Sequence, residues 1–293
     1  MGAILNVITA TGSSFTPVTN RYIRVAVVSG TQASGTVTFT FNNSIGYTIP
    51  NGSTITVSGS NVTAWNGTQT VTGGSNTTVQ FSNATAGTLS GTGLYSCVVA
   101  AVGSGTETVP TGATSLVISM YGGGGSGAYT STVNYGGGGG GGAQITSTTL
   151  SVSGGQTITY TVGAPGIGVS GATSTPGNNG TATTVTFTGV FVASAGGGNG
   201  GTGSTLGTGG TVSVTTGTAS SSNAGSNGTA GNSTTDGSGG AAGAGGTGGG
   251  ATATGGATSI NGNNLGGGST GGNTAPDAST YAAGAGYIAF SYT

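Results

Sequence analysis

The sequence contains no histidine and no lysine, and its two arginines and three carboxylates leave only 2% of the residues charged. Without imidazole, neither a Ser-His-Asp triad nor a Cys-His pair can form. The three carboxylates, Glu107, Asp236 and Asp277, are far apart in the sequence and form no evident acid–base pair and no Ca²⁺ loop. We therefore expect no enzymatic activity, no metal and no cofactor.

The scarcity of cations also limits the partners of the chain. Proteins bind the phosphates of nucleic acids with Lys and Arg, which release counterions, and polybasic segments draw proteins to anionic lipid. Arg21 and Arg24 alone cannot supply either interaction. We therefore expect no nucleic-acid partner and no electrostatic attachment to membranes.

Cysteine occurs once, as Cys97, which rules out an intrachain disulfide framework. The longest apolar runs, such as residues 97–102, are far shorter than the roughly 20 residues of a membrane-spanning helix, so no membrane insertion is expected. The first residues lack a basic segment followed by an apolar stretch, and we expect no secretory signal. This composition fits a particle that is assembled in the cytoplasm and then released, or a mature secreted chain whose signal has been removed.

Proline is scarce, with 6 residues, whereas glycine accounts for 69 of the 293. Collagen is excluded because no strict Gly-X-Y period holds. Low charge and a positive mean hydropathy argue against the usual disordered class. Each glycine loses more backbone freedom on folding than any other residue. A folded chain must therefore recover that cost through dense backbone hydrogen bonding or close backbone packing.

Residues 1–103 have the pattern of an all-β module. Short runs rich in Val, Ile, Thr, Tyr and Phe alternate with turn residues, and TVTFTF at 36–41 has the period of a half-buried strand. The spacing predicts a β-sandwich or barrel of roughly six to eight strands, and we take the sandwich as the expected form. The predicted strands are 22–29, 36–41, 54–58, 68–72, 78–81 and 94–101.

Part of this module resembles a small β-module of tailed-phage structural proteins. The likeness rests on ITVSG at 55–59, WNGTQTVT at 65–72, TTVQF at 77–81 and GTG at 91–93. Trp65 takes the place of the aromatic residue that precedes the Asn-Gly turn in that pattern, and we expect it in the core or at the rim of the module. The resemblance implies that residues 1–103 attach the protein to other virion proteins.

The remainder, residues 104–293, resembles the glycine-rich domain of phage tail-fibre and adhesin proteins from residue 107 onward. Residues 104–108 form the boundary between the two modules. The charged residues often interleaved in that domain are replaced here by Thr, Ser, Ala and Asn. Its motifs occur in order as VPTGATSLVISMYGGGG from 109, seven glycines at 136–142, LSVSGGQTITYTVG from 150 and GYIAFSY at 286–292.

The resemblance implies an all-β domain in which short strands frame packed, left-handed polyglycine II helices. Such helices have three residues per turn and no internal hydrogen bonds, so their N–H and C=O groups must pair with neighbouring helices. Side chains at the contacts would hold the backbones apart, which explains the glycine. A flexible linker over residues 193–272 is the alternative, but strand character returns at 281–293 and makes so long a loop costly.

Two motif matches arise by chance in so glycine-rich a sequence. GGSTG at 267–271 matches G-x-S-x-G, but it has no base and no preceding strand. GNGGTG at 198–203 matches G-x-G-x-x-G, but no helix follows and no acidic residue lies at the ribose-binding spacing. We assign neither motif a role in catalysis or dinucleotide binding.

Recognition by loops is the function that the sequence leaves open. Tyr129 and Tyr135 lie between two glycine runs, where the resembling adhesins expose variable loops, and tyrosine suits sugar or protein faces. Tyrosines that plug the edge of a glycine lattice would give the same pattern. Further polar loop candidates are Asn178, Asn179, Asn261, Asn263 and Asn264.

These observations predict a non-enzymatic structural protein on the exterior of a tailed-phage virion, as a tail fibre, adhesin or decoration protein. The glycine-rich domain would contact a host-surface glycan or an outer-membrane protein, and a homotrimer is expected for fibres of this kind. The alternative is a secreted adhesive or filament-forming surface protein of a microbe. A third hypothesis, an ice-binding protein, would require a regular threonine repeat, and none is evident.

Overall fold

The chain is described here by a computed structural model, in which strands dominate and confirm the all-β fold class. It describes residues 18–41, 48–49, 51–58, 60–89, 97–100, 104–109, 111–130, 135–169, 174–232, 237–240, 243, 266–269 and 283–292. The N-terminal elements are β1 (Val18–Ala33), β2 (Thr36–Phe41), β3 (Thr54–Ser58), the 3-10 helix η1 (Thr63–Trp65), β4 (Gly67–Gly74), β5 (Thr78–Ser82) and β6 (Cys97–Ala100). The later strands are β7 (Ser104–Thr108), β8 (Ser115–Tyr121), β9 (Gln144–Ser147), β10 (Leu150–Ser151), β11 (Thr157–Thr161), β12 (Thr183–Phe187), β13 (Phe191–Ala195), β14 (Val212–Thr216), β15 (Ala219–Asn223) and β16 (Gly286–Tyr292).

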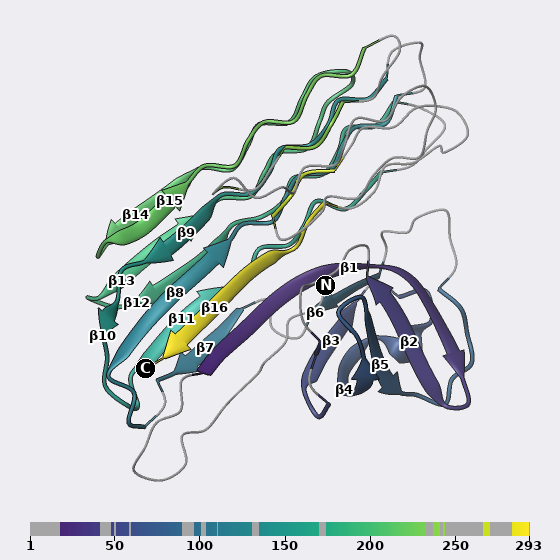
Figure 1. The fold of residues 1–293 in the computed structure, drawn as a ribbon. Helices are drawn as coiled ribbons and strands as arrows, with labels where there is room; N and C mark the ends of the chain where they lie inside the picture. Colours follow the sequence, from purple (N-terminus) through teal and green to yellow (C-terminus); the bar gives the residue numbers. More distant parts are fainter. Residues whose placement is uncertain are drawn as a thin grey trace.

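The N-terminal strands form a closed ring (Figure 1). Hydrogen-bonded neighbours follow the order β1, β2, β5, β4, β3, β6, and β6 pairs back with β1. All of these pairings are antiparallel. Ring closure gives each strand a partner on both sides, which removes exposed sheet edges. The module expected as a β-sandwich is thus a barrel, and its six strands lie where the sequence places them.

The barrel encloses an aromatic core. On β2, side chains alternate between half-buried and buried positions, which turns Val37, Phe39 and Phe41 inward. Trp65 is fully buried and meets Phe39 edge to face, with 5.7 Å between ring centroids. Its indole Nε1–H donates to the carbonyl oxygen of Thr85 at 3.0 Å. Trp65 is therefore a core residue, as predicted.

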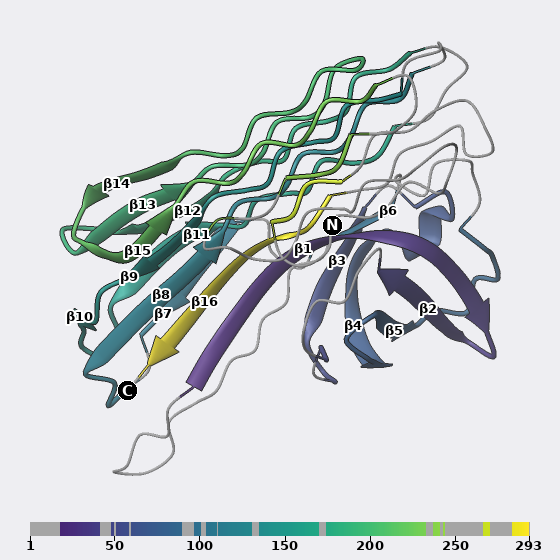
Figure 2. The same ribbon diagram turned by 45° about the horizontal axis from the view of Figure 1, so that its top comes forward.

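Strand β1 belongs to both halves of the molecule. Its first part, from Val18 opposite Tyr292 to Arg24 opposite Gly286, pairs with β16, and its last part pairs with β2. Figure 2 shows the same strand running along β16 before it bends into the barrel. The boundary predicted at residues 104–108 is itself a strand, β7, which pairs with β11. The division at residues 103 and 104 stays a prediction about domains.

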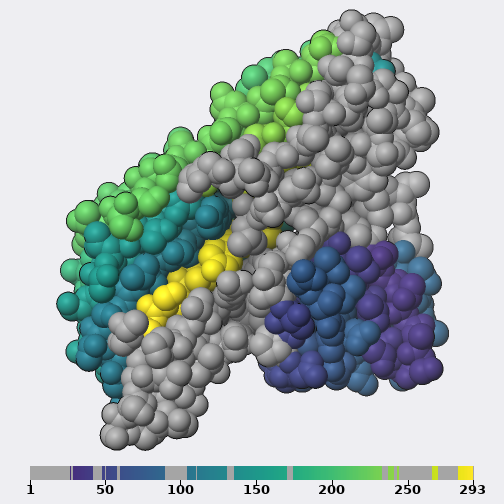
Figure 3. All heavy atoms as spheres, viewed as in Figure 1, coloured from purple at the N-terminus to yellow at the C-terminus, as the bar shows by residue number. Residues whose placement is uncertain are grey.

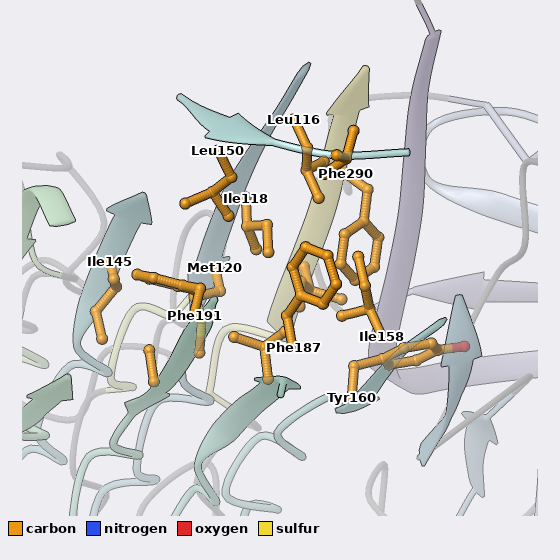
Figure 4. Packing of buried hydrophobic residues seen from close by; sticks show 14 of the residues in the cluster. Leu116, Ile118, Met120, Ile145, Leu150, Ile158, Tyr160, Phe187, Phe191 and Phe290 are labelled. Atoms are coloured by element: carbon orange, nitrogen blue, oxygen red, sulfur yellow. The ribbon is translucent and has the colours of Figure 1, made fainter. Parts of the chain in front are cut away.

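The C-terminal half is built on two facing sheets. One has the order β15, β9, β8, β16 and continues into β1; the other has the order β14, β13, β12, β11, β7. The alternation of each strand turns one set of side chains into the space between the sheets. Figure 4 shows how these side chains interlock. The cluster includes Leu116, Ile118, Met120, Ile145, Leu150, Ile158, Tyr160, Phe187, Phe191 and Phe290.

Beyond the sheets, the glycine-rich segments continue the strands as a stack of extended chains (Figures 1 and 2). Residues 122–130 follow β8, residues 135–143 lead into β9, and residues 196–210 connect β13 to β14. All described residues from 122 to 130 and from 136 to 145 are buried. We call this stack the glycine lattice. Because its segments continue the strands of the two sheets, the order of the strands sets which segments are neighbours.

Hydrogen bonds in the glycine lattice recur with a period of three residues. Within residues 122–129, amides three positions apart donate to the same neighbouring segment, and the acceptors descend by three, so the segments are antiparallel. Donors and acceptors toward residues 135–143 are Gly122 with Ala143, Gly125 with Gly140, and Ala128 with Gly137, at 2.8–2.9 Å. Toward residues 174–181 they are Gly123 with Thr181, Ser126 with Asn178, and Tyr129 with Thr175, at 2.9–3.0 Å.

The close approach of these segments requires glycine. A Cβ added at Gly139 would come within 3.0 Å of the carbonyl oxygen of Gly125, and one added at Gly140 would come within 3.0 Å of that of Thr208. Real Cβ atoms essentially never approach so closely. The obstacle is backbone in both cases, so no rotamer change can make room.

We predict that Gly139→Val disrupts the glycine lattice. The free energy of unfolding of the C-terminal half should fall by more than about 3 kcal/mol, the upper range for overpacked side chains, because fixed backbone must move. The barrel has its own core and should resist proteolysis. Thermal unfolding by circular dichroism and limited proteolysis measure both effects.

The matched control is Ala224→Val, because Ala224 is exposed on an outer segment. Its stability should stay within about 0.5 kcal/mol of the wild type. If Gly139→Val melts and resists protease like the control, residues 136–142 behave as a linker and close backbone packing is not what holds this half together.

Candidate recognition surface

The outer segments of the glycine lattice carry the exposed side chains. In Figure 3 the green segments, which include residues 205–232, form the edge farthest from the barrel. Along residues 199–211 every third side chain is exposed, while the positions between them are half-buried or buried. The exposed residues are Asn199, Thr202, Thr205, Thr208 and Thr211. Threonines therefore recur with a spacing of three, a repeat that the sequence analysis did not find. The chain reverses between Thr202 and Thr205, which exchange two backbone hydrogen bonds, so Thr205, Thr208 and Thr211 share one segment and Asn199 and Thr202 lie on the neighbouring one.

Asparagines on this surface close the edge of the lattice. The Oδ1 atom of Asn179 accepts a hydrogen bond from the Gly200 amide at 2.7 Å. The Oδ1 atom of Asn227 likewise accepts from the Gly209 amide at 2.9 Å. Each side chain takes the place that a carbonyl of a further segment would occupy. Sequence reasoning missed this role, whose signal is an Asn beside Gly at the edge of a glycine-rich run.

The predicted site residue Asn178 has a similar position. It is exposed, yet its Nδ2 donates to the carbonyl oxygen of Ile167 at 2.7 Å. Its backbone amide donates to Oγ of Ser126 at 2.8 Å. The structure thus places Asn178 and Asn179 side by side on the lattice surface, with hydrogen bonds of both side chains directed into the protein.

The two predicted tyrosines lie at the ends of two lattice segments, Tyr129 in residues 122–130 and Tyr135 in residues 135–143. Tyr129 is only 2% exposed, and its backbone exchanges two hydrogen bonds of 2.9 Å with Thr175. This burial favours a tyrosine packed at the lattice edge over one displayed to a partner. Tyr135 is half-buried, and its amide donates to the carbonyl oxygen of Asn232 at 3.0 Å. The candidates Asn261, Asn263 and Asn264 lie outside the described residues.

Buried serines replace backbone partners inside the lattice. Ser269, the central residue of the G-x-S-x-G match, is fully buried, and its Oγ accepts a hydrogen bond from the Gly127 amide at 3.1 Å. Oγ of Ser126 accepts from Asn178 and donates to the carbonyl oxygen of Ile167 at 2.9 Å. The other chance match, residues 198–203, lies within a lattice segment. Both motifs are therefore used for packing.

Neither a metal-ligand cluster nor a spanning helix is found in the part of the chain that the structure describes. No group of three or more Cys, Asp or Glu side chains comes together there. Within the same residues no helix is long and apolar enough to cross a membrane.

One buried ionisable pair ties the two sheets together. Glu107 on β7 is 5% exposed, and the hydroxyl of Tyr292 on β16 donates to its Oε1 at 3.0 Å. Burial, and secondarily the neighbouring Glu107 carboxylate, raise the pKa of Tyr292 far above its ordinary value. The pair joins positions 185 residues apart and fixes the edge strand β7 against the opposite sheet.

The Tyr292 pKa predicts a loss of stability at high pH. A tyrosine whose folded pKa exceeds its unfolded value of about 10 stabilises the fold fully below pH 10, and this contribution is lost as the pH rises toward the folded pKa. The free energy of unfolding should therefore fall above pH 10, and less steeply in Tyr292→Phe. That variant should also lose about 1–3 kcal/mol at neutral pH, because it leaves Glu107 without this donor. Urea unfolding between pH 7 and 12 tests both effects; identical pH curves for the two proteins would contradict the assignment.

A second prediction concerns the edge asparagines. Asn179→Ala and Asn227→Ala each remove an acceptor for a lattice amide, which should cost about 0.5–1.5 kcal/mol and lower the melting temperature by a few degrees. Asn76→Ala, at an exposed turn of the barrel, is the matched control and should change stability by less than about 0.5 kcal/mol. Calorimetry that finds all three variants alike would show that these side chains do not stabilise the edge.

Comparison with known proteins agrees with the geometry of the C-terminal half. Residues 99–292 match the family described as a glycine-rich domain. The match begins in β6 and ends with β16, so it covers both facing sheets and the glycine lattice. A search of curated proteins gives no match.

Proposed function

The chain belongs to the family of the glycine-rich domain, and from this premise we propose that it is a non-enzymatic structural protein on the exterior of a tailed-phage virion. The observation that carries the proposal is the glycine lattice, in which backbone groups of separate segments satisfy one another and the buried segments 122–128 and 136–143 contain only glycine, alanine and serine. Such a body needs no charge to stay folded and offers few charged sites for chemistry. It suits display as a tail fibre, adhesin or decoration protein.

The lattice segments, in this proposal, are polyglycine II helices. The support is the period of three in their hydrogen bonds, which equals the three residues per turn of that helix. Their amides donate to other segments, as expected for a helix without internal hydrogen bonds. The exposure of Thr205, Thr208 and Thr211, three positions apart on one segment, agrees with the same screw.

The barrel is the proposed attachment module, and the lattice is the part displayed to the host. The motifs in residues 55–93 that resemble tailed-phage structural proteins support the first assignment. The second rests on the resemblance of residues 107–293 to the glycine-rich domain of phage tail-fibre and adhesin proteins. The pairing of β1 with β16 supplies a firm connection between the two.

The proposal predicts that the protein copurifies with phage particles. Mass spectrometry of gradient-purified virions should detect it, and gold-labelled antibodies against residues 104–293 should mark the outer surface of intact particles in electron microscopy. Antibodies against the barrel should label only disrupted particles, because that module is held at the attachment point. Recovery of the protein in shed filaments without virions would support the alternative of a microbial surface filament and overturn the proposal.

A further inference from the structure

A shallow groove lies on the outer face of the sheet that contains β7, β11 and β12. It has a volume of about 440 Å³, within the range of small-molecule sites. Its lining is unusual because hydroxyl side chains dominate and no charged group takes part. The lining residues are Ser104, Gly105, Thr106, Thr159, Tyr160, Thr161, Thr184 and Thr186.

The strand register arranges these hydroxyls as a grid. Thr159 on β11 lies directly opposite Thr106 on β7 and Thr186 on β12. Two residues along the strand, Thr161 stands between Ser104 and Thr184 in the same way. Neighbouring strands are about 4.8 Å apart, and alternate residues of one strand are about 6.7 Å apart. The grid therefore offers rows of hydroxyls at regular intervals in two directions.

Strand alternation turns the side chains of the intervening residues toward the core, and of these only Tyr160 also borders the groove. Ile158 and Tyr160 of β11 point into the core between the sheets (Figure 4). Glu107, between Thr106 and Thr108, turns the same way and pairs with Tyr292. The threonine side chains therefore face the groove, whereas the carboxylate of Glu107 on β7 does not. A charged ligand would find no counter-charge here.

The groove hydroxyls differ from those at the lattice edge in how they are used. At the edge, Thr181 Oγ1 accepts from the Ala164 amide and Thr208 Oγ1 accepts from Asn199 Nδ2. In the groove, Thr159 Oγ1 makes one long contact of 3.4 Å to the Thr186 carbonyl oxygen. Among the described residues, the hydroxyls of Thr106 and Thr184 bond to no other protein group. These donors and acceptors remain available to a ligand.

We propose that this groove binds a short stretch of an uncharged glycan. A neutral, hydroxyl-rich chain matches a neutral grid of hydroxyls, and the strand spacing is close to the length of one pyranose unit. The assignment rests on the proposed role in host-surface recognition and names the class of ligand. Because each neutral hydrogen bond contributes little, we expect a dissociation constant on the order of 1 mM per site, strengthened by many copies on one particle.

The test uses the purified full chain and saturation-transfer difference NMR. The probes are maltohexaose, cellohexaose and N-acetylchitohexaose, with sialyllactose and heparin hexasaccharide as charged counterparts. At least one neutral probe should bind, and the charged probes should bind at least 10-fold more weakly. Binding of the charged probes alone, or of none, would overturn the proposal.

Substitutions in the groove separate hydroxyl recognition from shape. The triple variant Thr106→Val, Thr159→Val, Thr186→Val keeps β-branched side chains but removes one row of hydroxyls, and should weaken binding at least 5-fold. The corresponding Thr→Ser triple variant should retain it. Thr215→Val, on β14 of the same sheet and outside the groove, is the control and should bind like the wild type. If the valine triple variant, folded by circular dichroism, also binds like the wild type, the groove is not the site.

One competing occupant is ordered water. Thermal hysteresis of the wild-type chain that disappears in the valine triple variant would assign the grid to ice and overturn the glycan proposal. Virion association is measured separately, so failure of glycan binding with the protein still found on particles refutes only this inference. Glycan binding without virion association refutes only the location.

Discussion

Backbone amides inside the glycine lattice must find their partners in other segments, because the chains there are extended and all but free of side chains. Successive amides of residues 122–129 meet this requirement by donating to different neighbours, and toward residues 135–143 and 174–181 the same neighbour is reached again after three residues. A single segment could not satisfy itself. The lattice is therefore cooperative, because each segment supplies the backbone hydrogen-bond partners of the segments around it.

This requirement also explains where the side chains are. In the interior, a Cβ would strike a carbonyl oxygen, as at Gly139, and the few buried hydroxyls, such as Ser269, stand in for a missing backbone group. At the edge, amides that point outward have no further segment beside them, and another chain could pair with them as it does with an open sheet edge. Asn179 and Asn227 accept hydrogen bonds from the outward amides and so end the lattice within one molecule. The sheets at the base set the order of the segments.

Much of the fold could be predicted from the sequence because it depends on local patterns. Strand composition placed the barrel strands to within a few residues, as with β2 and β3, and the glycine runs predicted close backbone packing. Ring closure of the barrel and the shared strand β1 could not be predicted, since both depend on pairings between distant residues. For the candidate site, the sequence supplies the residue types but not their exposure. Exposure in a lattice of period three depends on which neighbours surround a segment, so the burial of Tyr129 and the exposure of Thr205, Thr208 and Thr211 emerge only in three dimensions.

The position of β16 has a consequence for how the protein is made. This strand lies between β8 and β1, and the two residues before it, Gly284 and Ala285, supply carbonyl acceptors to Gly124 and Gly266. On the ribosome, β1 and β8 emerge long before β16 does. The barrel can close early, whereas the edges of β1 and β8 that pair with β16 stay unpaired until β16 has been synthesised. Folding of the C-terminal half is thus a late, long-range event, of the kind that proceeds slowly, and a chain cut short before β16 would keep two sticky edges exposed to its neighbours.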